Sequence, residues 1–217
     1  MLVLADENQG VCSWGVPLDG DRGPVLVGGE LLDAGNSTVR YAASVEDFIA
    51  ARRWDRRCLD AGPLLQAQAP ELDQASLGHL QSLLSPAVST AGWPGSRQYR
   101  FEGLGVRVLL WSAAGQCDWW ISATGEDSLR AFTAGLLELP GLREALWSND
   151  DAGARLLTEL LRAGRLFTAH EGCAGDVAGQ SGHIAARPAG FPSWWMSGYT
   201  RVYPDIHYLR NPGRMRA

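Results

Sequence analysis

The chain of 217 residues contains no lysine, so all nineteen of its basic side chains are arginines. Twenty-four acidic residues outnumber them and give a net charge of −5 at pH 7. Proteins that bind nucleic acid generally carry excess positive charge, because they must neutralise phosphates. The composition therefore argues against a general nucleic-acid-binding protein.

Long apolar runs are also missing. No uninterrupted stretch approaches the ~18 residues that a membrane-spanning helix needs, and no signal peptide pattern opens the chain. The four cysteines, at positions 12, 58, 117 and 173, form no CxxC pair. We expect a reduced cytoplasmic setting with free, mostly buried thiols, and a disulfide framework is the alternative.

Residues 3 to 16 are the stretch around which the rest is organised. Two short apolar runs flank a polar group made of Asp6, Glu7, Asn8, Gln9 and Gly10. This pattern predicts two antiparallel strands, with Asn8, Gln9 and Gly10 forming the turn between them. Asn8 and Gly10 suit that position because a tight reversal needs a positive φ near its apex.

Apolar periodicity and turn residues predict the remaining elements. Strands are expected at 24–27, 38–42, 98–102, 106–111 and 117–121. Helices are expected to begin at Ser44, Asp73, Thr124 and Asp150. The hydroxyls of Ser44 and Thr124 can accept hydrogen bonds from the first helical turn. Residues 60 to 71 are rich in Ala, Pro and Gln and are interpreted as a linker.

These elements predict an α+β protein in which a twisted antiparallel sheet is packed by helices. Residues 1–59 would form one strand-and-helix unit, and residues 72–164 a second α+β unit packed with or after it. Residues 165–217 show no clean periodicity and are expected to be an irregular, poorly ordered tail that proteases cut first.

Residues that could carry chemistry are few. His170, Cys173 and His183 are ligand types that suit zinc, but their spacing matches no standard finger or knuckle. Ser181 lacks the Gly-x-Ser-x-Gly pattern of a nucleophile elbow. The sequence therefore predicts no catalytic residue, no metal and no cofactor, and a zinc-dependent hydrolase is the alternative.

The nine tryptophans are unusual for a chain of this length. Trp119 and Trp120 are adjacent on a predicted strand, so alternation places them on opposite faces. One should pack inward and the other should lie partly exposed beside Asp118. A partly exposed tryptophan is typical of an anchor at a protein interface. The alternative is a contact covered by the helix predicted over 124–139.

Three segments, ADENQGVCSWGVPL, PVLVGG and SVEDFIAARRW, resemble the SUKH superfamily of cell-wall regulators and toxin-immunity proteins. The resemblance covers residues 3 to about 58, and the Trp-pair segment is similar to an extension of actinobacterial members. It implies an α+β domain that acts as a non-enzymatic binder, in many members by neutralising a secreted toxin. The family usually has helices before this hairpin, so the unit is expected to be incomplete at its N-terminus.

Acidic residues gather around the opening hairpin, at Asp6, Glu7, Asp19 and Asp21, and Trp14 lies on the returning strand. Acidic charge beside an aromatic anchor would suit a basic toxin, because it would speed association. The alternative is that these are solvated turn acids and that Trp14 belongs to the core. A cytoplasmic immunity-type protein is the expected function, with a regulatory scaffold as the alternative.

Overall fold

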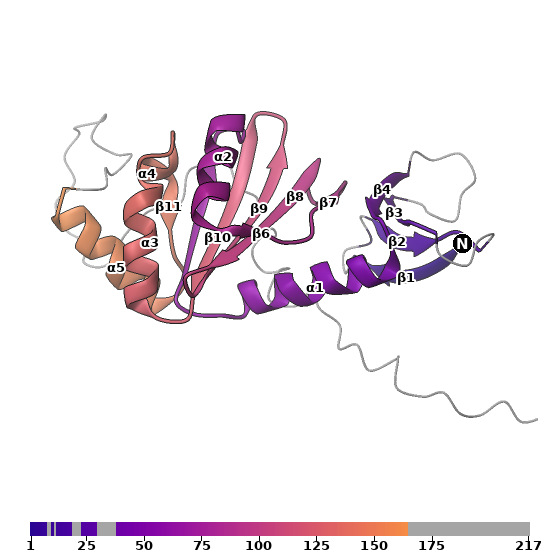
Figure 1. Ribbon diagram of the computed structural model, residues 1–217, viewed down its shortest axis with the longest axis horizontal. Helices are drawn as coiled ribbons and strands as arrows, with labels where there is room; N and C mark the ends of the chain where they lie inside the picture. Colours follow the sequence, from indigo (N-terminus) through magenta and orange to yellow (C-terminus); the bar gives the residue numbers. More distant parts are fainter. Residues whose placement is uncertain (8–9, 11, 19–22, 30–37, 165–217) are drawn as a thin grey trace, which may run out of the picture.

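The computed structural model describes residues 1–7, 10, 12–18, 23–29 and 38–164. They form an α+β fold with two antiparallel sheets and five helices, which confirms the predicted fold class (Figure 1). The expected single sheet is divided into a four-stranded N-terminal sheet and a seven-stranded large sheet. Within this part of the chain, none of the helices combines the length and apolar character required to cross a bilayer.

The N-terminal sheet has the strand order β1-β2-β3-β4. Its strands are β1 (Leu2–Asp6), β2 (Ser13–Val16), β3 (Val25–Gly28) and β4 (Val39–Ala42). The opening hairpin pairs β1 with β2 as predicted. Gly10 has φ +73°, so its positive φ is confirmed. Asn8 and Gln9 lie outside the described residues.

Helix α1 (Val45–Leu59) extends from the N-terminal sheet to the large sheet (Figure 1). It begins where predicted, because the Ser44 hydroxyl accepts a hydrogen bond from the Asp47 N–H at 3.1 Å. Its first half packs Phe48 into the core of the N-terminal sheet. Its second half packs Trp54 and Cys58 against the large sheet. One amphipathic helix therefore joins the two sheets.

The large sheet has the strand order β11-β5-β10-β9-β8-β6, and β7 also pairs with β8. Its strands are β5 (Leu64–Ala69), β6 (Ser85–Pro86), β7 (Thr90–Ala91), β8 (Arg97–Gly103), β9 (Val106–Ala113), β10 (Gln116–Ala123) and β11 (Leu146–Trp147). The meander β8–β9–β10 confirms the three strands predicted in this region.

The interpretation of residues 60 to 71 as a linker is wrong for its central part. Residues 64–69 form β5, which pairs with β10 on one side and with β11 on the other. Its side chains alternate between buried Leu65, Ala67 and Ala69 and partly exposed residues between them. The two-residue alternation of a strand was present in the sequence. The segment contains alanines instead of β-branched residues, however, and such a composition resembles that of a linker.

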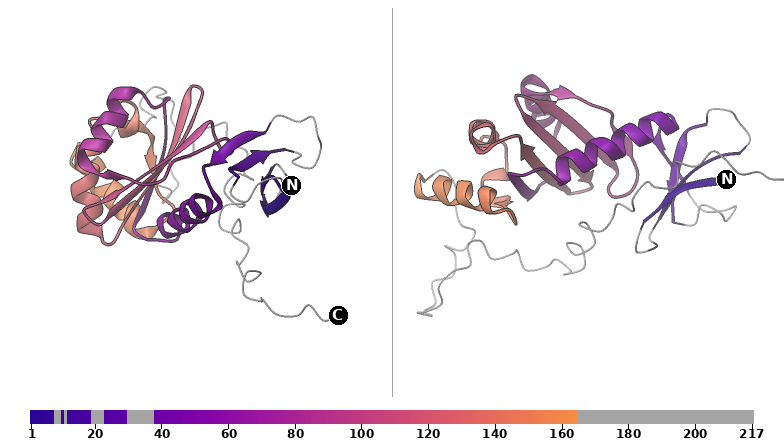
Figure 2. Two further views of the ribbon diagram at one scale, coloured as in Figure 1. Left: turned by 45° about the vertical axis from the view of Figure 1, so that its right-hand side comes forward. Right: turned by 90° about the horizontal axis from the view of Figure 1, so that it is seen from below.

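Four helices cover the face of the large sheet opposite α1 (Figure 2). They are α2 (Gln74–Leu83), α3 (Glu126–Leu136), α4 (Leu142–Ala145) and α5 (Asp151–Arg162). Helices α2 and α5 begin where predicted, and the structure shows that the Asp73 and Asp150 carboxylates cap them. The predicted cap at Thr124 is wrong: its N–H donates to the Gly105 carbonyl, so Thr124 stays with the sheet and α3 begins after Gly125.

Candidate binding site

The main core lies between the large sheet and helices α2 to α5. The opposite face of the sheet, on which α1 packs, is here called the α1 face. Directly paired residues of neighbouring strands share a face. The registers place Trp147, Gln66, Trp120, Leu109 and Arg100 in one row across five strands. Leu109 and Arg100 are buried, whereas the other three are partly exposed. The row therefore runs from beneath α1 out to solvent.

The half of the α1 face beneath the helix, here called the covered half, is tightly packed. Leu109 and Trp111 of β9 form a buried cluster with Trp54 and Cys58 of α1. The Trp111 and Trp120 rings lie with their centroids 4.1 Å apart. Apolar contact of this kind is the main force that holds a helix on a sheet.

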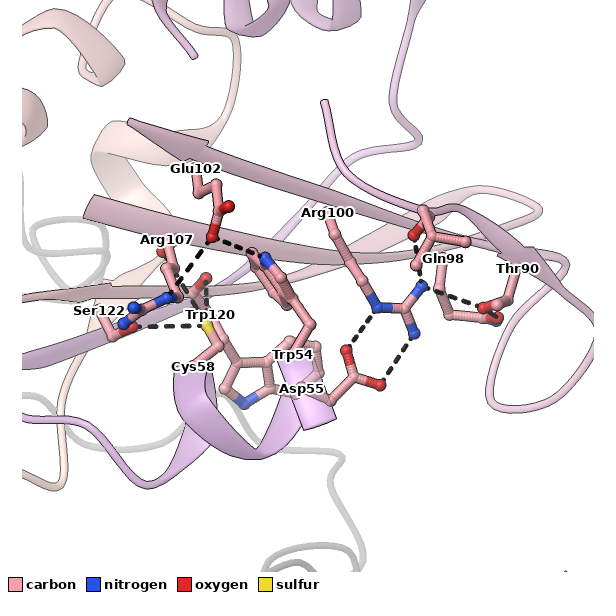
Figure 3. A network of polar contacts seen from close by, with 11 residues as sticks. Trp54, Asp55, Cys58, Thr90, Gln98, Arg100, Glu102, Arg107, Trp120 and Ser122 are labelled. Atoms are coloured by element: carbon pink, nitrogen blue, oxygen red, sulfur yellow. Dashed lines mark hydrogen bonds and ion pairs between the residues drawn. The ribbon is translucent and has the colours of Figure 1, made fainter. Parts of the chain in front are cut away.

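A buried ion pair fixes the helix at the same place (Figure 3). The Arg100 guanidinium on β8 donates to both carboxylate oxygens of Asp55 on α1, at 2.6 and 2.8 Å. Its third nitrogen donates to the Val88 carbonyl and to the Thr90 hydroxyl, each at 3.1 Å. Thr90 in turn donates to the side-chain carbonyl of Gln98 at 2.7 Å. The charges are thus satisfied by protein groups on several sides.

The charges of this pair depend on each other. Burial raises the pKa of the Asp55 carboxyl, and the charge of Arg100 acts against that increase. Burial alone would lower the pKa of Arg100, but the charge and hydrogen bonds of Asp55 raise it overall. Removing either partner would leave an uncompensated charge in a low-dielectric environment. We therefore assign the pair to positioning α1.

Two further contacts hold α1 on the sheet beside the ion pair (Figure 3). The Trp54 indole N–H donates to the Glu102 carboxylate at 3.1 Å. The buried Ser122 hydroxyl donates to the Cys58 sulfur at 3.5 Å. Burial raises the pKa of the Cys58 thiol to about 12, so this sulfur is uncharged at neutral pH. Both contacts explain how the helix is held.

The remainder of the α1 face, here called the open patch, is partly exposed. It consists of side chains from β5, β10 and β11, namely Gln66, Gln68, Gln116, Asp118, Trp120 and Trp147. Trp120 and Trp147 both pair with Gln66, from opposite sides, so the two indoles flank one glutamine. The patch therefore combines two aromatic side chains, three amides and one carboxylate.

Asp118 is held in place by its amide neighbours. Gln68 donates to its Oδ1 at 3.2 Å, and Gln116 lies 3.3 Å from both carboxylate oxygens. Burial raises the pKa of the Asp118 carboxyl, while these hydrogen bonds lower it in part. Among the described residues, no arginine lies within ion-pair distance of Asp118. The carboxylate is thus oriented but lacks a counterion within this part of the chain.

The structure separates the two tryptophans that the sequence singled out. Trp119 is 3% exposed and belongs to the main core, which α3 and α5 cover. Trp120 is partly exposed and lies on the opposite face, as alternation predicted. The predicted cover by the helix of residues 124–139 therefore applies to Trp119 and not to Trp120.

The opening hairpin contains fewer exposed site residues than its sequence indicated. Trp14 is 1% exposed and packs against Tyr41, Phe48 and Trp93, so it belongs to the core. Glu7 is also buried, whereas Asp6 is exposed and accepts a hydrogen bond from the Ser13 hydroxyl at 2.5 Å. Asp19 and Asp21 lie outside the described residues. Asp6 is thus the described acidic residue that this surface offers to solvent.

The arginines of α1 are also partly accounted for. The Arg52 guanidinium lies over the Trp14 ring, 5.1 Å from its centroid, and Arg56 pairs with Asp60 at 3.2 Å. A stacked guanidinium of this kind shields the edge of the N-terminal core. Arg53 and Arg57 are exposed on the helix surface.

The possible zinc ligands His170, Cys173 and His183 lie outside the described residues. Within the part of the chain that is described, no three or more His, Cys, Asp or Glu side chains group in a way that could hold a metal ion. Cys12, Cys58 and Cys117 are free and buried, as predicted, and burial raises the pKa of each thiol to about 12.

Sequence reasoning missed half of the open patch. Gln66 and Gln68 lie on the strand that was interpreted as a linker, and Trp147 lies on a two-residue strand with no periodicity of its own. The alternation of LLQAQA was the signal that could have identified the glutamines. No comparable signal exists for Trp147, because its pairing with β5 joins two segments that lie far apart in the sequence.

Comparisons with known proteins found no matching family model, no matching curated protein and no matching solved structure.

Proposed function

We propose that this chain is a non-enzymatic protein-binding module whose partner contacts the open patch. The pairing of Trp120 and Trp147 across Gln66 is the observation that carries the proposal. Tryptophan is enriched among the residues that contribute most to binding, because one side chain buries a large area at little cost in conformational entropy. The surrounding amides can donate and accept hydrogen bonds at the same interface.

The partner that we propose is a secreted toxin, which the chain would neutralise in the cytoplasm as SUKH-like immunity proteins do. The resemblance of residues 3 to about 58 to that superfamily supports this choice. The net charge of −5 supports it as well, because many toxins act on nucleic acid through basic active sites. An acidic protein would meet such a site at a rate increased by electrostatic attraction.

Co-expression tests the proposal directly. The product of the gene immediately upstream should be toxic alone, and the wild-type chain should restore growth. The double variant Trp120→Ala, Trp147→Ala should lose protection and bind the purified toxin at least about 30-fold more weakly, as expected for interface hot spots. Leu104→Ala is the matched control, because Leu104 is 78% exposed on the β8–β9 turn, outside the patch.

Two results would contradict the proposal. An upstream product that is harmless would favour the alternative, a regulatory scaffold with several partners. Full protection by the double variant would place the interface elsewhere, with the hairpin as the next candidate. Charge reversal of Asp6, Asp19 and Asp21 to Lys would then be expected to lower the association rate and its dependence on salt.

A further inference from the structure

Strand β1 differs from the other edge strands of the two sheets in what protects it. It is the end strand of the N-terminal sheet, and among the described strands it pairs with β2 alone (Figure 1). A strand edge offers N–H and C=O groups to another strand, and proteins commonly protect it by short length, proline or charge. The edge strands β6, β7 and β11 have two residues each, and β4 carries the exposed Arg40. Residues 2–5 of β1 are all apolar and include no proline, so they lack these three protections.

The surface beside β1 is apolar as well. Five large apolar side chains are exposed in the described part of the chain, and three of them are Met1, Leu2 and Leu18. Leu2 is 54% exposed although it lies within a strand. Exposed apolar side chains that gather at one place are typical of a contact surface. The edge of β1 therefore combines an open backbone with apolar side chains.

The strand registers show which side chains of β1 share a face. One row of paired residues includes buried members of the N-terminal core, namely Ala5, Trp14 and Val27. The neighbouring row points away from that core and consists of Val3, Gly15 and Leu26. Leu4 packs against the core, and Leu2 pairs with Val16, which packs there too. Leu2 and Leu4 thus lie on the core side of the sheet, and Val3 lies on its outer side.

We propose that β1 pairs antiparallel with β1 of a second copy of this chain, about a two-fold axis at Val3. Residues directly opposite each other in an antiparallel pair share a face. A register centred on Val3 meets this condition, because it places Val3 opposite its own counterpart and Leu2 opposite Leu4. A register centred on Leu4 fails, because the irregularity between Val3 and Ala5 puts these two residues on different faces.

The residue types of β1 favour a second copy as the occupant of its edge. In the register centred on Val3, the paired side chains are all apolar, and Asp6 lies beyond the paired stretch. No carboxylate therefore faces another carboxylate across the contact. The same edge is used in both copies, so the assembly closes at two chains. This surface belongs to the N-terminal sheet and is separate from the open patch, so the assignment does not depend on the proposed function.

Sedimentation velocity of the full chain over a range of concentrations tests the assignment. Wild type should change reversibly from monomer to dimer as the concentration rises. Val3→Lys and Val3→Glu should each weaken dimerisation about 10-fold or more, because each places two like charges directly opposite one another. An equimolar mixture of the two variants should recover the dimer, because lysine then faces glutamate. Leu104→Lys is the matched control, since Leu104 is exposed on the large sheet, and it should dimerise like wild type.

Near-ultraviolet circular dichroism should show that the variants keep the wild-type fold. Leu2→Lys is the second edge variant, because Leu2 is exposed and its substitution spares folding; it should also weaken dimerisation. A wild-type chain that stays monomeric at every concentration would overturn the assignment, and it would mean that another segment or another protein occupies the edge. A dimer that the charge variants leave unchanged would place the contact on a different surface. Variants that are monomeric alone and remain so when mixed would rule out the register at Val3.

Discussion

The covered half of the α1 face and the open patch lie on one face of the same sheet, but their acidic and aromatic side chains have different surroundings. Beneath α1, Asp55 is neutralised by Arg100, and Leu109 and Trp111 pack against the helix. Beyond the helix, Asp118 has no described counterion, and Trp120 and Trp147 remain partly exposed. In the covered half the acidic residue is paired with an arginine and the apolar residues are buried, whereas in the open patch the acidic residue meets amides and the tryptophans stay partly exposed.

This difference indicates which residues serve stability and which are available for contact. A row of paired residues that begins at buried Arg100 and ends at partly exposed Trp147 passes from one role to the other within a single sheet. Substitutions in the covered half should therefore act on folding. Substitutions in the open patch should act on binding and leave folding almost unchanged.

Arg100→Met tests the covered half most severely. The variant keeps the apolar stem but leaves the Asp55 carboxylate buried without a counterion, which should cost about 3–5 kcal/mol of the free energy of unfolding. Urea denaturation measures this change. The double variant Arg100→Met, Asp55→Leu should recover most of the loss, because it removes both charges. A single variant as stable as wild type would show that the ion pair does not hold the helix.

Leu109→Ala and Gln66→Ala form a matched comparison, because both residues pair with Trp120, one from each side. Leu109 is 0% exposed, so its truncation should create a cavity and cost about 2–5 kcal/mol. Gln66 is partly exposed, and its truncation should change stability by no more than about 0.5 kcal/mol. Thermal unfolding of the two variants side by side measures both effects. Similar losses would remove the distinction between the two halves.

The sequence predicted the elements whose signals are local. The hairpin turn at Gly10, the cap at Ser44 and the opposite orientation of Trp119 and Trp120 all follow from residues within a few positions of each other. It did not predict the open patch, because that surface depends on contacts between distant segments. β5 is inserted between β10 and β11, and no local pattern states which strands will be its neighbours.

The acidic residues show the same limit. The sequence drew attention to Asp6, Glu7, Asp19 and Asp21 because they cluster along the chain, yet the described part of the hairpin buries Glu7. Asp55 and Asp118 stand alone in the sequence, and their importance arises from what lies opposite them in space. Whether an acidic residue contributes to packing or binding depends on its tertiary surroundings, and these are not revealed by its neighbours along the chain.

Asp118→Asn should change stability less than Arg100→Met or Leu109→Ala does, and in the opposite direction. Burial raises the pKa of Asp118 in the folded protein above the value of about 3.9 in an unfolded chain, so the folded state binds this proton more readily. Stability from this group is therefore present at low pH and is lost as the pH rises from about 4 through the raised pKa. Asparagine cannot lose a proton, so the variant should be as stable as wild type near pH 4. At pH 7 it should be more stable by a few tenths of a kcal/mol to about 1 kcal/mol, as is usual for partly exposed sites.

Because Asp55 titrates identically in both proteins, subtracting the two curves of unfolding free energy against pH isolates Asp118. A variant that is less stable than wild type at pH 7 would mean that the Asp118 charge already has a counterion in the folded chain, and the contrast with Asp55 would disappear.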